Sequence, residues 1–194
     1  MQFGKLSLQL VGSQKLSNSK SVSTKGGAQT TSFDIDASDY EDNRHFFLSH
    51  YFRGKYDEAM SRLPNLTTGI TINRVEIWVT NKTGTTSNSR DIVALTDLGE
   101  ANISNPMWSA SGMVPSNAGN TEYTTLNALG TGVRDIEQVG STLEGMGLTG
   151  GVDFEKLESA RLLTSSEYTL NSALGYVSLR TSLQTDQVLA IAYE

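Results

Sequence analysis

The sequence predicts an α+β fold, in which a mostly antiparallel sheet is covered by one long amphipathic helix and by smaller helices. Apolar residues recur at helical spacing between residues 38 and 63. The run GITINRVEIWVTN, residues 69–81, is rich in β-branched and aromatic residues, which favours a strand. With 194 residues and 37% hydrophobic content, the chain is long enough to build one domain with a core.

The first 33 residues differ from the remainder in charge and pattern. They contain four lysines and no acid, and Asp34 is the first carboxylate of the chain. Residues 3–11 alternate apolar and polar side chains, which predicts either the edge strand of a soluble domain or a lipid-facing strand of a membrane barrel. Gly26-Gly27 predicts a turn between strand formers. We therefore expect residues 1–33 to form a flanking strand or hairpin segment, and residues 34–194 to form a single α+β domain.

The ends of the chain suggest a piece of a longer protein. Gly4 and Lys5 interrupt the only apolar run at the amino end, so no secretory signal is visible. The chain stops directly after the strand-like run VLAIAYE. We expect an excised domain.

The long helix is predicted from Ser38 to Leu63. Ser38 and Glu41 have the spacing of a capping box, in which two backbone N–H groups at the start of a helix gain partners. Pro64 is expected to end the helix. The aromatic side of this helix is expected to cover the sheet that includes residues 69–81.

The remaining elements follow in order. After a turn near Gly84, the run RDIVAL is expected to pair antiparallel with the strand of residues 69–81. Further helices are expected at 133–146 and at 153–163, and the end of the chain is expected to form two strands joined at Thr185-Asp186.

Residues 102–132 form a long polar excursion, rich in Ser, Asn, Gly and Thr. Segments of this length without secondary structure are uncommon in compact domains, so a functional loop or a mobile segment is expected. Trp108, in its middle, suggests that part of the loop is anchored. We expect this loop to contact partners, with a merely disordered connection as the alternative.

Composition argues against several classes of function. The net charge of −6 argues against a general nucleic-acid binder, and the absence of cysteine excludes disulfides and zinc fingers. His45 and His50 are five residues apart, which on a helix separates them by roughly 140° and disfavours a shared metal. We expect His45 to be a packed or hydrogen-bonded core histidine and His50 to lie among polar side chains.

The sequence carries no enzyme signature. It has no G-x-S-x-G motif, phosphate-binding glycine loop or dinucleotide fingerprint. Asp97 and Glu100 in TDLGE could pair as in a glycoside hydrolase, but a strand-exit turn with exposed acids is the simpler explanation. We therefore predict no enzyme, and no catalytic, cofactor-binding or metal-binding residue.

Several long blocks, in a fixed order, resemble the SprA (Sov) family. The resemblance covers nearly the whole chain and is weakest between Asn102 and Gly132. The blocks are TKGGAQTTSFDI, DYEDNRHFFLSHYFRGKYDEAMSRLP, GITINRVEIWVTN, RDIVALTDLGE, ARLLTSSEYTLNSALGYVSL and DQVLAIAYE.

This resemblance implies a role in protein secretion and gliding motility. The family's proteins are very large outer-membrane β-barrel translocons of the type IX secretion system. The chain would be a soluble domain inserted into such a barrel, at the cell surface or on the periplasmic face. It would help to cap or gate the pore and would contact secreted cargo proteins or other secretion-system subunits. The family offers no catalytic residue or cofactor to carry over.

Two other classes of function remain open at this stage. An adhesion or glycan-binding module could use Trp78 or Trp108 as an exposed stacking platform, and burial of both would count against it. A hydrolase could use Asp97 and Glu100 if the two acids lay in a cleft.

Overall fold

The computed structural model describes residues 34–84 and 86–194, and the chain separates into two compact units, Met1–Asp39 and Tyr40–Glu194. Of the first unit, the described residues end in a 3-10 helix, η1 (Ala37–Asp39), closed by a 2.9 Å hydrogen bond from Asp39 N to Asp36 O. The strand and hairpin predicted within residues 1–33 lie outside the described residues.

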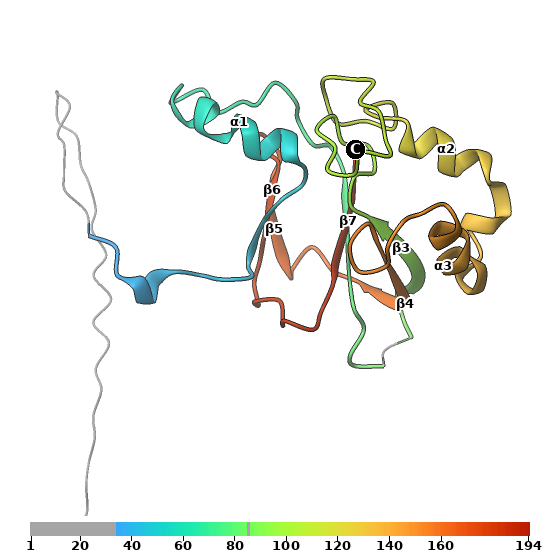
Figure 1. The fold of residues 1–194 in the computed structure, drawn as a ribbon. Helices are drawn as coiled ribbons and strands as arrows, with labels where there is room; N and C mark the ends of the chain where they lie inside the picture. Colours follow the sequence, from blue (N-terminus) through green and yellow to red (C-terminus); the bar gives the residue numbers. More distant parts are fainter. Residues whose placement is uncertain (1–33, 85) are drawn as a thin grey trace, which may run out of the picture. The chain divides into compact units, whose positions relative to one another are not determined.

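Two antiparallel sheets form the framework of the second unit (Figure 1). The three-stranded sheet has the order β1-β6-β5, with β1 at His45–Phe47, β5 at Tyr168–Asn171 and β6 at Tyr176–Leu179. The four-stranded sheet has the order β3-β4-β2-β7, with β2 at Val75–Val79, β3 at Ser89–Leu95, β4 at Phe154–Leu162 and β7 at Leu189–Tyr193.

The helices of this unit are short. Figure 1 shows α1 on the side of β5 and β6, and α2 and α3 on the side of β3 and β4. Their bounds are His50–Met60 for α1, Glu122–Ala128 for α2 and Ile136–Gly145 for α3, with the 3-10 helix η2 at Gly130–Val133.

The predicted α+β fold, with a single sheet under one long helix, is wrong. The described residues form two sheets and only short helices, and none of these covers a sheet along its length. Within the predicted helix, Asn43 has a positive φ of 54°, and the next residues form β1, which pairs with β6. The helix proper begins only at His50. Pairing with a strand far along the chain overrides the helical spacing of the aromatic residues, because most helical stability comes from tertiary packing.

The helix predicted at 153–163 is also wrong, because this segment forms β4. Phe154, Leu157 and Ala160 are three residues apart, which resembles a helical period. Ser159 has a positive φ of 51°, and the register of β3 against β4 shifts between Arg90 and Ile92. Such a bulge adds one residue to the strand, so the buried side chains of β4 fall three residues apart where an undisturbed strand would bury every second one. This spacing resembles that of a helix.

The other predicted elements are partly confirmed. The strand in residues 69–81 exists as β2, but its neighbours are β4 and β7, so the predicted pairing with β3 is wrong. The helix predicted at 133–146 is confirmed as α3, whose N-cap residue Asp135 accepts a hydrogen bond from Glu137 N. The two strands at the end exist as β6 and β7, which belong to different sheets.

Three apolar clusters form the core of the second unit. The first joins α1 to both sheets through Phe52, Ile77 and Val177, each 0% exposed. The second lies under α2 and α3 and contains Trp108. The third contains Trp78, whose ring lies 5.5 Å from the guanidinium carbon of Arg90.

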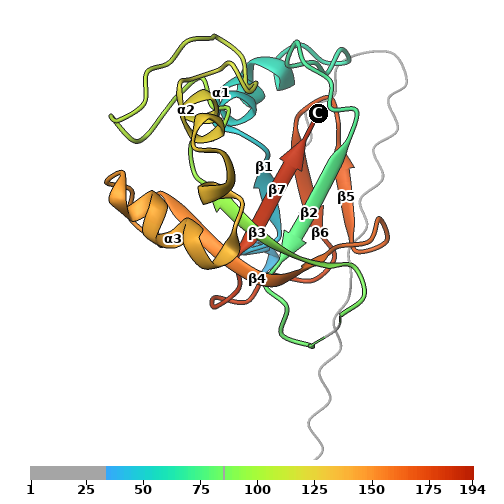
Figure 2. The same ribbon diagram turned by 90° about the vertical axis from the view of Figure 1, so that its right-hand side faces the viewer.

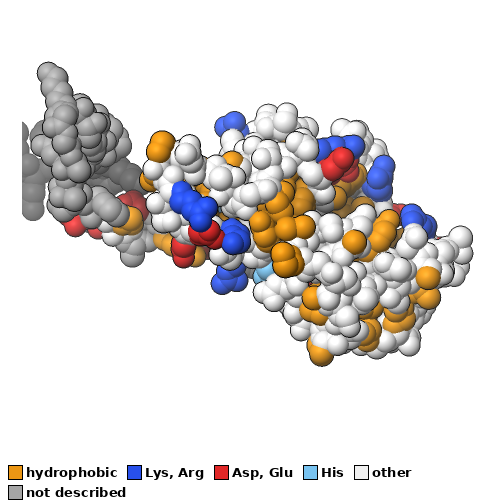
Figure 3. All heavy atoms as spheres, turned by 90° about the horizontal axis from the view of Figure 1, so that it is seen from above, with side chains coloured by type: hydrophobic (Ala, Val, Ile, Leu, Met, Phe, Trp, Pro, Cys, Tyr) orange, Lys and Arg blue, Asp and Glu red, His pale blue; other side chains and the backbone are white. Residues whose placement is uncertain are grey.

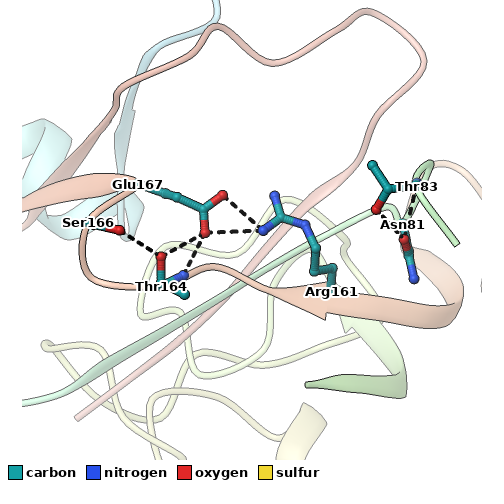
Figure 4. A network of polar contacts seen from close by, with 6 residues as sticks. All are labelled: Asn81, Thr83, Arg161, Thr164, Ser166 and Glu167. Carbon is teal, nitrogen blue, oxygen red and sulfur yellow. Dashed lines mark hydrogen bonds and ion pairs between the residues drawn. The ribbon is translucent and has the colours of Figure 1, made fainter. Parts of the chain in front are cut away.

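A polar network fixes the turn that leads from β4 to β5 (Figure 4). Arg161 of β4 donates to both carboxylate oxygens of Glu167, at 2.9 and 3.1 Å, and Thr164 donates to the same carboxylate through N and Oγ1. Partial burial opposes the charged form of Glu167, but the hydrogen bonds from Thr164 and Arg161 outweigh it and hold the pKa below its ordinary value. The network therefore sets the path of the chain between the two sheets.

Candidate functional site

The candidate site is the segment between β3 and α2, residues 97–121, which we call the anchored loop. Its two ends are tied together by Asn120, which is 2% exposed. The side-chain amide of Asn120 donates to Asp97 O at 2.6 Å and to Glu100 O at 3.0 Å. A buried amide with two carbonyl partners closes the base of the loop.

The first part of the loop folds around the carboxylate of Asp97, which is 3% exposed. This carboxylate accepts hydrogen bonds from the backbone N–H groups of Ser104, at 2.9 and 3.0 Å, and of Asn105, at 2.7 Å. The side-chain amide of Asn105 then donates to Asp153 Oδ1 at 2.8 Å. Charge-assisted hydrogen bonds of this kind are stronger than neutral ones, so the backbone here has a defined path.

The second part of the loop is a narrow hairpin-like excursion. Ala110 and Asn120 form an isolated antiparallel bridge. Nearer the tip, Ser111 N and Gly112 N both donate to Gly119 O, at 2.9 and 3.1 Å. A Cβ on Gly119 would lie 2.7 Å from the carbonyl oxygen of Gly99, so only glycine fits where these two backbones meet.

Trp108 anchors the middle of the loop, as the sequence predicted. Its side chain is in the second core cluster with Leu126 and Leu143, and the residue is only 6% exposed. Other apolar residues of the loop point outward, and Figure 3 shows apolar side chains at the surface on the face that carries α1 and this loop. The exposed large apolar residues of the loop are Leu98 at 42%, Met107 at 42%, Met113 at 89% and Val114 at 45%.

Two buried glutamates lie in the loop or directly after it. Glu100, 7% exposed, accepts a 3.1 Å hydrogen bond from the backbone N–H of His50, the first residue of α1. Burial raises the pKa of Glu100, and the charge of Asp97 adds to it, while the contact with His50 lowers it. Glu122, 1% exposed, begins α2, and burial raises its pKa to about 7, with the charges of Asp97 and Asp153 acting in the same direction. Oε2 of each glutamate accepts no hydrogen bond within the described part of the chain.

The prediction that Asp97 and Glu100 are exposed acids of a strand-exit turn is therefore wrong. Both residues are buried, and both hold backbone groups of the loop or of α1. The sequence gives no signal for Asn120 and Glu122, because polar residues in a Ser-, Asn- and Thr-rich run carry no pattern that marks them as buried. Asp153 is expected only near the start of the helix predicted at 153–163, and not as a partner of the loop.

His45 is not the core residue that the sequence predicted. It is exposed on β1, where Nδ1 lies 2.8 Å from Ser178 Oγ and Nε2 lies 2.9 Å from Glu41 Oε2. The hydrogen bonding predicted for His45 is confirmed, while the burial predicted for it is wrong. Across residues 34–84 and 86–194, no group of three or more His, Asp or Glu residues could hold a metal ion.

The tryptophans do not form an exposed stacking platform. Trp78 is 8% exposed and Trp108 is 6% exposed. Burial of both residues is the outcome that counts against a glycan-binding surface built on them.

The fold and this site define a β-rich domain that carries an ordered, partly apolar surface loop. A family model, SprA_N, described as motility related/secretion protein, matches residues 3–185. The chain therefore belongs to this family, which confirms the resemblance to the SprA family over nearly its whole length. No curated protein matches the chain. Among the helices of the described residues, none has the length and apolar character needed to cross a membrane.

Proposed function

We propose that the second unit is a non-enzymatic contact element of an outer-membrane protein-export channel of the type IX secretion system. In this proposal it helps to cap or gate the channel, and its anchored loop contacts secreted proteins or neighbouring subunits. Membership of a motility and secretion family supports the general role. The anchored loop is the observation that carries the finer proposal.

The loop combines a fixed backbone with adaptable apolar side chains. Asn120, Asp97 and Trp108 fix its base and middle, so little conformational entropy remains to be lost when a partner binds. Met113 at the tip is 89% exposed. Methionine side chains are flexible and polarizable, and they suit surfaces that bind several different partners. A secretion channel that handles many cargo proteins needs such tolerance.

The buried acids support a structural role for the polar residues of this region. Asp97 and Glu100 bind backbone N–H groups of the loop and of α1, and both are closed off from solvent. In the proposal, these residues give the loop its shape and take no part in chemistry.

A secretion assay with tip variants tests the proposal. Met113→Asp, made in the full-length protein in its own cells, places a charge on the apolar tip, and we expect secretion of cargo to fall at least threefold. Val152→Asp is the matched control, because Val152 is 69% exposed and lies outside the loop. Equal secretion by both variants, at equal protein levels, would contradict the proposal.

A further inference from the structure

The four-stranded sheet ends in an open edge at β3. Among the strands of residues 34–84 and 86–194, β4 is the only one that pairs with β3, and none of the seven residues of β3 is fully buried. The backbone N–H of Thr96 donates to Asp153 O, so the backbone groups of Thr96 face β4. Because the direction of these groups alternates along a strand, the N–H and C=O groups of Leu95 and Val93 point away from β4, towards the open edge. In the described sheets, the other edge strands are shorter: β1 has three residues, β5 four and β7 five.

A groove of about 380 Å³ runs along this edge. One wall is β3, and the other is formed by α2, η2 and α3, which Figure 2 shows beside β3. Val93 and Leu95 line the groove from the face of β3 that packs toward α2 and α3, and Ile92, whose side chain packs on the other face, lines it as well. The groove therefore reaches from this face of β3 to the edge of the strand. The opposite wall is mostly apolar and includes Tyr123, Leu126, Ile136, Val139 and Leu143.

Only the first half of β3 carries the features that normally protect an edge strand. Arg90 and Asp91 are charged, and the register shift lies between Arg90 and Ile92. Natural edge strands use such charges and bulges to prevent pairing with other chains. Residues 92–95 have no charge, no proline and no bulge. This half of the edge is open to pairing.

We propose that the groove binds an extended segment of a partner protein as an added strand on β3. The backbone of the segment would pair with the outward-facing groups of Val93 and Leu95, and its alternate apolar side chains would enter the groove. Two acids line the groove: Asp91, whose Oδ1 accepts a 2.6 Å hydrogen bond from Ser159 N, and Asp135, whose carboxylate accepts from Glu137 N and Gln138 Nε2. Arg134 is the one cationic residue of the lining and donates to Asn127 Oδ1 at 3.3 Å, so acids outnumber bases there. In the proposal, the bound segment of the partner protein therefore contains a basic residue next to its alternating apolar residues.

This surface goes beyond the proposed function of the anchored loop. Leu98 is the one residue of the loop that lines the groove. The groove would recognise the backbone of a partner segment and its alternating apolar side chains, whereas the loop tip presents flexible apolar side chains of its own. The two surfaces can be tested, and can fail, separately.

The test uses the 194-residue chain and a fluorescein-labelled peptide, KVTVTV, with fluorescence anisotropy as the readout. Two further peptides carry N-methyl groups on one or the other set of alternate backbone amides. Only one set can face β3, so one methylated peptide should bind about tenfold more weakly and the other should bind like the parent. Because the change is in the peptide, this result does not depend on how a protein variant folds.

Protein variants locate the binding site. Leu98, 42% exposed, lies at the groove, and Leu98→Glu should weaken binding about tenfold, since it places a charge beside apolar peptide side chains. Leu63→Glu is the matched control, because Leu63 is 64% exposed and does not line the groove. Asp91→Asn with Asp135→Asn should weaken binding of KVTVTV about threefold and should strengthen binding of EVTVTV.

Three outcomes would overturn the proposal. Equal binding of both methylated peptides would mean that apolar side chains enter the groove without strand pairing. Self-association of the chain that Leu98→Glu abolishes would identify a second copy as the occupant. No binding at millimolar peptide would leave the edge without this function.

Discussion

The apolar core around α1 and the base of the anchored loop are held by different forces. In the core, Phe52, Ile77 and Val177 are 0% exposed, and their contacts are apolar. At the loop, the buried groups are polar. Four of the six buried polar or charged residues of the described chain belong to the loop or flank it, namely Asp97, Glu100, Asn120 and Glu122.

The apolar core and the polar loop base therefore have different roles: the first provides stability and the second determines shape. Burial of apolar surface stabilises without regard to direction, whereas a buried hydrogen-bond network is favourable only when its geometry is satisfied. We therefore expect the core to supply most of the stability of the second unit and the polar residues to select one loop conformation. The unpartnered oxygens of Glu100 and Glu122 indicate that this selection has an energetic cost.

The largest expected effect is on the core, from Gly175→Ala. A Cβ at residue 175 would lie 2.1 Å from Cγ of Phe52, and the backbone has a φ of +63°, which disfavours other residues. We expect the free energy of unfolding to fall by about 3 kcal/mol or more, measured by urea denaturation.

The matched control for this change is Gly54→Ala. Gly54 lies in α1, and a Cβ there meets nothing within 4 Å. Because alanine favours helix over glycine, this variant should be as stable as the parent or more stable by up to about 1 kcal/mol. Equal losses in both variants would show that the close approach to Phe52 does not matter.

Asn120→Ala should disrupt the loop and leave the core intact. It removes the two hydrogen bonds that close the loop and leaves the carbonyls of Asp97 and Glu100 without that partner, at a cost of about 1–3 kcal/mol. In hydrogen exchange, the amides of Ser111 and Gly119 should lose protection, whereas the amide of Ile77 should exchange as before. Asn127→Ala, at an exposed position, is the control.

A smaller effect is expected from Glu122→Gln, and it should depend on pH. The pKa of Glu122 rises on folding from an ordinary 4.5 to about 7, so the folded state holds a proton that the unfolded state releases in this range. The contribution of Glu122 to stability should therefore be greatest below pH 4.5 and should fall as the pH rises towards 7.

Glutamine cannot ionise, so the variant should be more stable than the parent by about 1–2 kcal/mol at pH 8 and should show little gain at pH 5. Urea denaturation at the two pH values measures the difference. Glu100, whose pKa is raised in the same direction, should still contribute to the fall in stability of the variant with rising pH. An identical pH dependence in the variant and the parent would refute the role given to Glu122.

The smallest effect on stability should come from Met113→Asp. Met113 is 89% exposed, and changes at such positions usually alter stability by no more than about 0.5 kcal/mol. A melting temperature equal to that of the parent would show that any loss of secretion in this variant arises from a lost contact. A large loss of stability would mean that the tip is part of the folded core.

The sequence predicted those elements whose local pattern agrees with their packing. The strand β2 and the helix α3 are of this kind, as is the anchoring of Trp108. The helix predicted from Ser38 failed because residues 45–47 pair with β6, which lies far along the chain. β4 was predicted as a helix because the bulge at Ser159 gives a strand a period of three.

The candidate site was less predictable than the fold. The excursion predicted at 102–132 is correct only for its first part, because Glu122–Ala128 form α2 and Gly130–Val133 form η2. Nothing in the sequence marks Asn120 as buried and bonded to two carbonyls. Its role depends on the position of Asp97 and Glu100, 23 and 20 residues away. Hydrogen bonds at such separations follow from the tertiary fold and not from a local motif.

The most direct test of the contact role is photo-crosslinking from the tip of the anchored loop in secreting cells. A benzophenone amino acid would replace Met113 in the full-length protein, with Val152 as the control position, and adducts would be identified by mass spectrometry. We predict adducts with secreted proteins or secretion-system subunits at position 113 and far fewer at position 152. If position 113 gives no adducts, or if both positions give the same ones, the anchored loop is not a contact surface.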